Sequence, residues 1–135
     1  MPILFNDIPA SCINYAAVTY HVPATLILSV LKIENGRNGL AKKNKNGSYD
    51  YGPMQINSYW LPKLKIHGIT AHDLRYNPCI NVAVGAWILA QALSEGHHFQ
   101  QGVGNYNSHT ASLNQRYAHQ VLRWYHLFEN KKDPG

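Results

Sequence analysis

Cysteine is scarce in this chain of 135 residues, where it occurs only at Cys12 and Cys79. Two thiols without a C-x-x-C spacing make no zinc site by themselves. The chain is also long enough to bury a core without metals or many disulfides. The two cysteines are therefore either buried free thiols in a reduced compartment or one bridge between two predicted helices. A bridge between Cys12 and Cys79 would close a long loop of the chain. For such a loop, the chain-entropy model gives a stabilisation of the fold of about 4 kcal/mol.

Long apolar runs are absent as well. No segment approaches the ~20 consecutive apolar residues of a membrane-spanning helix, so we expect no membrane span. No N-terminal segment has a basic region followed by an apolar core, so no secretion signal is visible. This fits either a cytosolic protein or a mature form from which the signal has been removed. There is no repeat, low-complexity tract or linker, which indicates one domain.

Acidic residues are few: the chain has 7 Asp and Glu against 12 Lys and Arg, a net charge of +5. This balance favours an anionic partner such as a cell-wall polymer, nucleic acid or an acidic membrane. The densest basic stretch holds Lys42, Lys43 and Lys45, and it is either a solvated loop or a surface that steers a polyanion. No stacking motif accompanies these lysines, so we predict no nucleic-acid partner.

The 8 histidines show no recognised metal-ligand spacing. His97 and His98 are adjacent, and His119 and His126 share the face of a predicted helix. No carboxylate or third ligand is placed beside either pair. We therefore predict no metal and no cofactor.

Hydrophobic periodicity and helix-boundary residues predict a mainly helical chain. The expected helices cover residues 9–20, 23–34, 58–67, 77–95 and 112–128, with a weaker helical turn at 100–106. Ser58, a Thr70–Asp73 capping box and a Ser112–Gln115 capping box are expected to begin three helical segments. The tail at 131–135 should fray.

The β signal is confined to residues 48–56, where Tyr49, Tyr51 and Ile56 favour short strands. Asn46-Gly47 predicts a tight turn at the end of a polar loop over 38–47. Pro53 argues against a central strand, so we expect a small ribbon at an edge. The predicted fold class is α+β, mainly helical with a small β-hairpin.

Glu34 is the first candidate for chemistry. It ends a predicted helix and shares a face with Ile27, Val30 and Leu31. Burial on that face and the negative end of the helix dipole both disfavour the charged carboxylate, which would raise its pKa. A raised pKa suits a general acid that works near neutrality. The alternative is a partly exposed glutamate with no chemistry.

Four local patterns support the acid. They are Ile33–Gly36, Asp50–Asn57 with its Gly-Pro-Met-Gln-Ile-Asn element, Gly104–Ser108, and Tyr117 on the last helix. Together they resemble the lytic transglycosylase domain of the lysozyme-like superfamily, and in particular the small enzymes that accompany bacterial secretion and conjugation machines. The resemblance runs from about Cys12 to Phe128. The Gly-x-Met-Gln-Ile-Asn element is quite specific, whereas Tyr-Asn alone is weak.

The resemblance implies one lysozyme-like domain over residues 1–135, with a core at about 9–128 and an active-site cleft. It implies cleavage of the MurNAc–GlcNAc β-1,4 bond of peptidoglycan by a monomer in the periplasm or cell envelope, serving a secretion or conjugation machine. The early Cys12 and the start at Asn77–Ile80 match the same subgroup. The resemblance therefore favours a Cys12–Cys79 disulfide and an oxidising compartment.

Asp50 separates two reaction types. Residues Asn44–Gly52 resemble the β-hairpin of c-type lysozymes, in which the aspartate at this place is the second catalytic carboxylate. Asp50 is thus a second carboxylate of a hydrolytic muramidase, an electrostatic or positioning group, or an Asx-type turn residue. In a transglycosylase, Glu34 alone would act as acid and then as base, closing a 1,6-anhydro ring without water. A third possibility is a non-catalytic wall-binding protein that keeps the cleft.

The remaining candidates would bind substrate. The resemblance places Met54, Gln55, Asn57, Tyr106, Asn107 and Tyr117 in that role, with Met54 lining the pocket and Tyr117 orienting the acid. Bracing of the hairpin is the alternative for Gln55, capping of the next helix for Asn57 and core packing for Tyr106.

Four residues, at three places in the chain, depart from the family pattern. Asn35 replaces the serine that usually follows the glutamate, Pro53 replaces a leucine, and Ser108-His109 stands where Ala-Gly is usual. None of these changes removes the acid, so we still expect activity.

Overall fold

The computed structural model describes residues 4, 5 and 7–132 and is mainly helical, as predicted. Within that part of the chain, the α-helices are α1 (Ala10–Tyr20), α2 (Ala24–Glu34), α3 (Leu61–Lys65), α4 (Ala71–Tyr76), α5 (Pro78–Glu95), α6 (Phe99–Asn105) and α7 (Ala111–Lys132). A 3-10 helix, η1 (Ser58–Trp60), precedes α3. The expected fraying of the tail concerns residues 131–135, of which 133–135 lie outside the described residues.

The predicted ribbon is a three-stranded antiparallel sheet in the order β3-β4-β5. Strand β3 (Ala41–Lys43) pairs with β4 (Tyr49–Tyr51), and β4 pairs with β5 (Ile56–Asn57). The prediction of loop throughout 38–47 is wrong for β3, whose backbone pairing with β4 outweighs its polar composition. A second pair, β1 (Leu4–Phe5) with β2 (Ile8–Pro9), was not predicted, because two-residue strands leave no alternation to detect.

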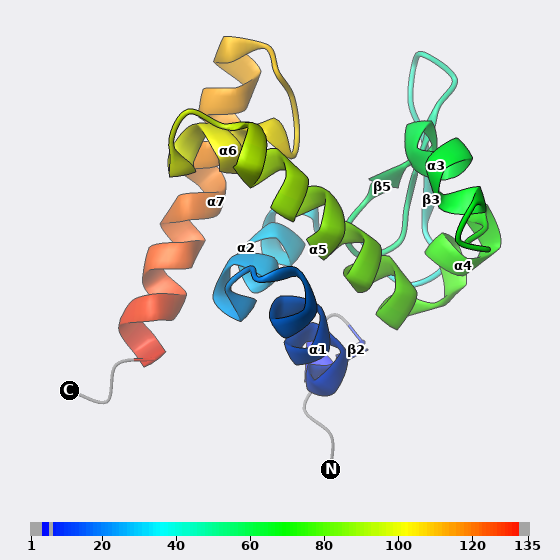
Figure 1. The fold of residues 1–135 in the computed structure, drawn as a ribbon, viewed down its shortest axis with the longest axis horizontal. Helices are drawn as coiled ribbons and strands as arrows, with labels where there is room; N and C mark the ends of the chain where they lie inside the picture. Colours follow the sequence, from blue (N-terminus) through cyan, green and yellow to red (C-terminus); the bar gives the residue numbers. More distant parts are fainter. Residues whose placement is uncertain (1–3, 6, 133–135) are drawn as a thin grey trace.

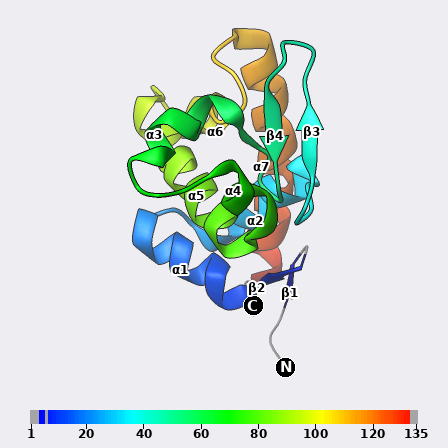
Figure 2. The same ribbon diagram turned by 90° about the vertical axis from the view of Figure 1, so that its right-hand side faces the viewer.

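Helix α5 crosses the middle of the molecule and joins two regions (Figure 1). It packs against α1 and α6 on one side and against α4 and β5 on the other. Helices α2 and α7 pack together beside it, and the sheet with α3 and α4 forms the opposite region, as Figure 2 shows from the side. Burial explains the central place of α5, because its Val82, Ala86 and Leu89 are all fully buried.

Two prolines and one asparagine are the N-cap residues of α1, α2 and α5. Pro9 and Pro23 are the N-cap residues of α1 and α2, one position earlier than an N1 proline. Asn77 caps α5, and the Thr70–Asp73 capping box of α4 is confirmed.

Two predicted caps are wrong. The side chain of Asn57 caps η1, and the Ser58 hydroxyl accepts a hydrogen bond from Tyr49 N instead. Helix α7 begins at Ala111, so Ser112 already lies inside its first turn. For η1, the competing polar group is the side chain of Asn57, one residue before Ser58.

A disulfide joins Cys12 of α1 to Cys79 of α5, across a Cα–Cα distance of 5.3 Å. The predicted bridge is therefore present, and it fastens the first helix to the central one. Among the described residues, no single helix is long and apolar enough to cross a membrane. Helices α1 and α2 pass that test only when taken together across a bend of 119°, by length and composition alone.

Candidate active site

A cleft of about 650 Å³ lies between the sheet region and the α6–α7 region. We call residues 49–63 its hairpin wall, residues 104–117 its helical wall, and the exposed face of α5 its floor. The cleft is lined by Glu34, Asp50, Gln55, Asn57, Tyr59, Trp60, Lys63, Ile88, Gln91, Ala92, Glu95, Asn105, Tyr106, Asn107 and His109. The cleft therefore holds all the predicted site residues except Met54 and Tyr117.

Glu34 is delivered to the cleft by the last turn of α2. The apolar face predicted for this helix is real, since Ile27, Val30 and Leu31 are all completely buried. Asn35 ends the helix in the left-handed conformation (φ 53°), which asparagine tolerates better than most residues. Gly36 then passes so close to the β4–β5 turn that an added Cβ would lie 2.1 Å from Gly52 O. A side chain at Gly36 would push Glu34 away from the hairpin wall.

The carboxyl group of Glu34 is partly buried, and its pKa is raised from 4.5 to about 7. Burial is the largest cause, because it disfavours the charged form. A hydrogen bond from Tyr117 lowers the pKa, the negative charge of Asp50 raises it, and the positive charge of Lys42 lowers it. Both the protonated and the ionised form are therefore accessible near neutral pH, so the group can donate and accept a proton.

Two tyrosines surround the carboxyl group. The Tyr117 hydroxyl donates to Glu34 Oε2 at 2.7 Å, and no described residue hydrogen-bonds Oε1. The Tyr106 ring stacks on Tyr117 with centroids 6.3 Å apart, and its hydroxyl donates to Met54 O at 2.9 Å. Burial raises the pKa of both phenols well above the usual value, so both remain neutral donors. This arrangement holds one carboxyl oxygen and leaves the other available to a ligand.

Asp50 faces the same cleft from β4. Its Oδ1 accepts a hydrogen bond of 2.8 Å from Asn57 Nδ2 on β5. Gln55 also lines the cleft, while its Nε2 donates to Gly52 O at 2.9 Å. Asn57 and Gln55 thus have the bracing contacts that we considered as alternatives, and their cleft-facing position leaves ligand contact open.

Met54 does not line the cleft. Its side chain is completely buried, and an added Cβ on Gly85 of α5 would lie 2.2 Å from its sulfur. The prediction of a pocket-lining methionine is therefore wrong, because the apolar side chain packs on the floor helix from beneath. Met54 contributes its backbone instead, since its carbonyl oxygen accepts the Tyr106 hydrogen bond.

The departures from the family pattern fit the structure. Pro53 is buried in the β4–β5 turn. His109 extends the helical wall and lies 3.4 Å from Glu95 at the end of α5, where both side chains are exposed. The side chain that stands in place of the usual glycine therefore contacts the floor helix at the end of the cleft where α5 ends.

Two buried asparagines were missed by sequence reasoning. Asn81 of α5 donates to Tyr51 O and Leu74 O, both at 2.8 Å, and accepts from Met54 N at 2.9 Å. It therefore fixes the β4–β5 turn, and with it the hairpin wall, to the floor. A lone asparagine within an apolar helix gives no local signal of such a role, although its place among apolar residues in α5 indicates burial.

Asn114 of α7 does the same for the helical wall. Its Nδ2 donates to Gln101 O at 3.0 Å, Asn105 Oδ1 at 2.8 Å and Ser108 O at 3.2 Å. Gly104 lies against it so closely that an added Cβ would be 2.1 Å from Asn114 Oδ1. The glycine of the Gly104–Ser108 pattern is therefore the residue that lets α6 approach Asn114 this closely.

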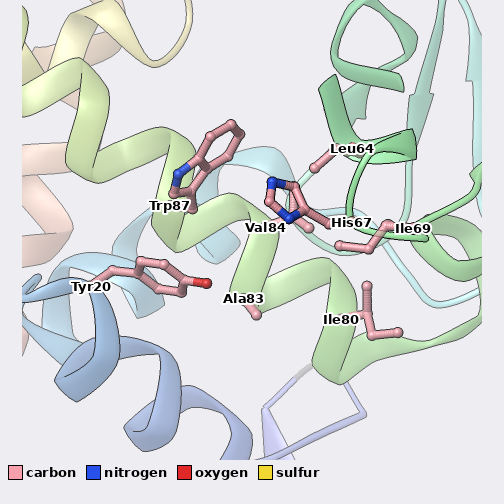
Figure 3. A pocket seen from close by; sticks show the side chains of 8 residues that line it. All are labelled: Tyr20, Leu64, His67, Ile69, Ile80, Ala83, Val84 and Trp87. Carbon is pink, nitrogen blue, oxygen red and sulfur yellow. The ribbon is translucent and has the colours of Figure 1, made fainter. Parts of the chain in front are cut away.

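A second hollow of about 350 Å³ opens between α1, α5 and the α3–α4 connection. Figure 3 shows its largely apolar lining, which includes Tyr20, Ile80 and Trp87 with His67 at the side. It contains no carboxylate. Within the described residues, no group of three or more His, Cys, Asp and Glu side chains is placed to hold a metal ion. Of the two hollows, the cleft at Glu34 has the groups for acid–base chemistry.

Comparison with known proteins agrees with this geometry. Residues 11–121 match the family described as "Transglycosylase SLT domain". The invasion protein IagB of Salmonella typhimurium is 32% identical over 125 residues, covering 89% of this chain and 78% of the relative. Protein IpgF of Shigella sonnei is 31% identical over 121 residues, covering 86% and 80%. A peptidoglycan-binding-like protein of Escherichia coli O157:H7 is 35% identical over 116 residues, covering 79% and 69%.

The match spans the acid-bearing helix, the hairpin wall, the floor and the helical wall. The α+β arrangement and the cleft are those of the lysozyme-like fold that the sequence predicted. The chain belongs to the transglycosylase SLT domain family and has a lytic transglycosylase-like function directed at peptidoglycan.

Proposed function

We propose that the chain is a peptidoglycan lytic transglycosylase. It cleaves the MurNAc–GlcNAc β-1,4 bond and leaves a 1,6-anhydro-muramoyl end. The observation that carries the proposal is Glu34, a carboxyl group with a pKa of about 7 in the middle of a polar cleft. A single carboxyl group that acts first as the acid and then as the base needs both protonation states near neutral pH. A pKa of about 7 provides both.

In the first step, the protonated Glu34 donates its proton to the glycosidic oxygen, which is a poor leaving group until it is protonated. Tyr117 occupies Oε2, so the proton is passed from Oε1. As the proton leaves, the Tyr117 hydrogen bond stabilises the carboxylate that forms.

In the second step, the substrate's own acetamido group shields the cationic anomeric carbon. The ionised Glu34 then takes the proton from the C6 hydroxyl of the same muramoyl residue, and that oxygen bonds to the anomeric carbon. The proton count closes, because Glu34 returns to its starting form and no water is consumed. Asn107 and Gln55 provide neutral hydrogen-bond partners for the sugar from opposite walls.

A hydrolytic muramidase is the second candidate, and Asp50 favours it. This carboxylate shares the cleft, is oriented by Asn57, and raises the pKa of Glu34 through its charge. A retaining hydrolase would use it as the nucleophile at a carboxyl separation of ~5–5.5 Å from the acid. A non-catalytic wall-binding role is the third candidate, and the raised pKa of Glu34 argues against it.

We further propose a place in the periplasm or cell envelope and a role in opening the wall for a secretion or conjugation machine. The disulfide supports an oxidising compartment, and the similarity to an invasion protein supports the proposed role beside such a machine. We also propose that the chain works as one catalytic domain and as a monomer.

The mass of the products released from purified peptidoglycan tests the reaction. Muropeptides one water lighter than hydrolytic products are expected, whereas reducing-end products would establish the muramidase. Glu34→Gln should abolish release with the fold intact by circular dichroism. Glu129→Gln makes the same chemical change on α7 outside the cleft and should leave release unchanged. Wild-type turnover by Glu34→Gln would remove the catalytic assignment.

A further inference from the structure

One end of the cleft holds a cation without an anionic partner. Lys63 lines the cleft from α3, and its Nζ lies 5.2 Å from the centre of the Trp60 ring. Among the described residues, the one side-chain contact within 4.0 Å between a basic and an acidic residue joins His109 to Glu95. Lys63 therefore presents a positive charge to the cleft that no described carboxylate neutralises.

The floor holds a second donor without an acceptor. Gln91 lines the cleft, and its Nε2 is the buried side-chain nitrogen for which no hydrogen-bond partner exists among the described residues. An unpaired buried amide is costly, so side chains of this kind are usually satisfied. Rotation of the side chain toward a ligand in the cleft would give this nitrogen an acceptor and remove the cost.

Aromatic contacts connect the two donors. Tyr59 is 68% exposed in the cleft and packs edge-on against Trp60, which packs in turn against Trp87 of α5. Gln91 follows Trp87 by one helical turn and therefore lies on the same face of α5. Lys63 and Gln91 thus belong to one end of the cleft, behind an exposed ring that can pack on a sugar.

We propose that Lys63 and Gln91 form a subsite for the acidic arm that a muramoyl residue carries on its lactyl group. Two donors that lack acceptors suit a ligand with carboxylate and carbonyl oxygens. In peptidoglycan, the lactyl group ends either in its own carboxylate or in a stem peptide that bears carboxylates. An N-acetylglucosamine residue has no such arm. The inference rests on the proposed function and adds discrimination between peptidoglycan and neutral glycans.

Lys63→Gln tests the charge, with Lys65→Gln as the matched control. Lys65 is an exposed lysine of the same helix that does not line the cleft. With intact peptidoglycan at low salt, Lys63→Gln should raise KM about fivefold with kcat unchanged, and high salt should shrink the difference. Lys65→Gln should behave as wild type. For a neutral N-acetylglucosamine hexamer, all three proteins should have the same dissociation constant.

Gln91→Leu tests the floor. Removal of an unpaired buried amide should raise the thermal midpoint, while KM for peptidoglycan should rise about threefold. A purely structural glutamine would lower the midpoint when replaced and leave KM unchanged. That result would overturn the role of Gln91.

The source of the acidic group is read from peptidoglycan whose stem peptides have been removed by an amidase, which frees the lactyl carboxylate. A Lys63 effect that survives this treatment assigns the lactyl carboxylate, and one that disappears assigns the peptide. An equal loss of Lys63→Gln affinity for the neutral hexamer, or an unchanged KM for intact peptidoglycan, would overturn the proposal.

Binding without cleavage separates this proposal from the proposed function. Glu34→Gln protein with and without Lys63→Gln should co-sediment with intact peptidoglycan to different extents. Equal co-sedimentation beside normal cleavage by wild type would remove the subsite alone. Different co-sedimentation beside absent cleavage by wild type would remove the transglycosylase reaction alone.

Discussion

The hairpin wall and the helical wall are each held by one buried asparagine, but the two asparagines reach different distances along the chain. Asn81 belongs to the floor and bonds Tyr51 and Met54, some 30 residues earlier in the sequence. Asn114 belongs to the helical wall itself, and its partners all lie within 13 residues of it. The hairpin wall is therefore fixed by tertiary structure, and the helical wall mainly by its own local structure.

The walls also act on Glu34 in opposite directions. The Tyr117 hydroxyl, on the helical wall, lowers the pKa of the carboxyl group, while the Asp50 charge, on the hairpin wall, raises it. The value of about 7 is thus set by burial and then adjusted from both sides. The comparison shows that one acid can be tuned by two independently anchored regions.

Replacing each anchor by alanine gives the largest expected effect. Asn81→Ala should lower the free energy of unfolding by about 3–5 kcal/mol, because it leaves three polar groups of the buried turn and helix end unpaired. Asn114→Ala should cost about 1–3 kcal/mol, because its partners in α6 and at Ser108 are only partly buried, so that water can replace the amide. Denaturant unfolding of both variants measures the difference, and equal costs would contradict it.

Glu34, which lies between the two walls, should make the free energy of unfolding depend on pH. The folded-state pKa of Glu34 is raised from 4.5 to about 7, so the folded protein holds this proton more tightly than the unfolded chain. The contribution of Glu34 to the free energy of unfolding should therefore be largest below about pH 4.5 and fall by roughly 3 kcal/mol as pH rises through 7. Glu34→Gln should remove this fall and be the more stable protein at pH 8. Unfolding measured at pH 4 and pH 8 checks the sign, and a wild-type advantage at pH 8 would contradict it.

Changing one wall at a time should move the pH dependence of activity in opposite directions. Tyr117→Phe removes the hydrogen bond that lowers the Glu34 pKa, so the alkaline limb of kcat/KM should move to higher pH. Asp50→Asn removes the charge that raises the pKa, so the limb should move to lower pH. Both shifts should be smaller than the effect of burial, which is the largest cause. Movement of both limbs in the same direction would refute the opposition of the walls.

The smallest effect concerns the bond that joins the walls. Tyr106→Phe removes the hydrogen bond to Met54 O and keeps the ring stacked on Tyr117. The free energy of unfolding should fall by about 1 kcal/mol, the ordinary value for one such bond. Asn81→Ala should then lower the free energy of unfolding by less in the Tyr106→Phe background than in the wild-type protein. Both substitutions remove a hydrogen bond that holds the β4–β5 turn. Strict additivity would show that the walls are not coupled through Met54.

The elements with strong periodic patterns could be predicted from the sequence. Helices α2 and α5 carry apolar faces bounded by Pro23, Asn77 and Gly96, and the structure has them at almost the predicted residues. Strand β3 could not be predicted, because its three residues are polar and gain their structure from pairing with β4. Short strands of this kind depend on partners that a local pattern does not contain.

The candidate site divides in the same way. Glu34 and Asp50 were predicted from local patterns, and the structure brings both into one cleft. Met54 was wrongly predicted to line the pocket, because the pattern that names a residue does not say which side of the turn faces the ligand. Asn81 and Asn114 were missed, because their partners lie on other segments and only the fold brings these together.

The bond between Cys12 and Cys79 has a topological consequence for these two regions. The closed covalent ring contains Glu34 and the whole hairpin wall, whereas the helical wall lies outside it. A reductant would therefore loosen the two regions unequally. Amide hydrogens of the hairpin wall should exchange faster once the ring opens, and those of α7 should keep their protection. The redox state of the surroundings thus acts on the half of the cleft that carries the acid.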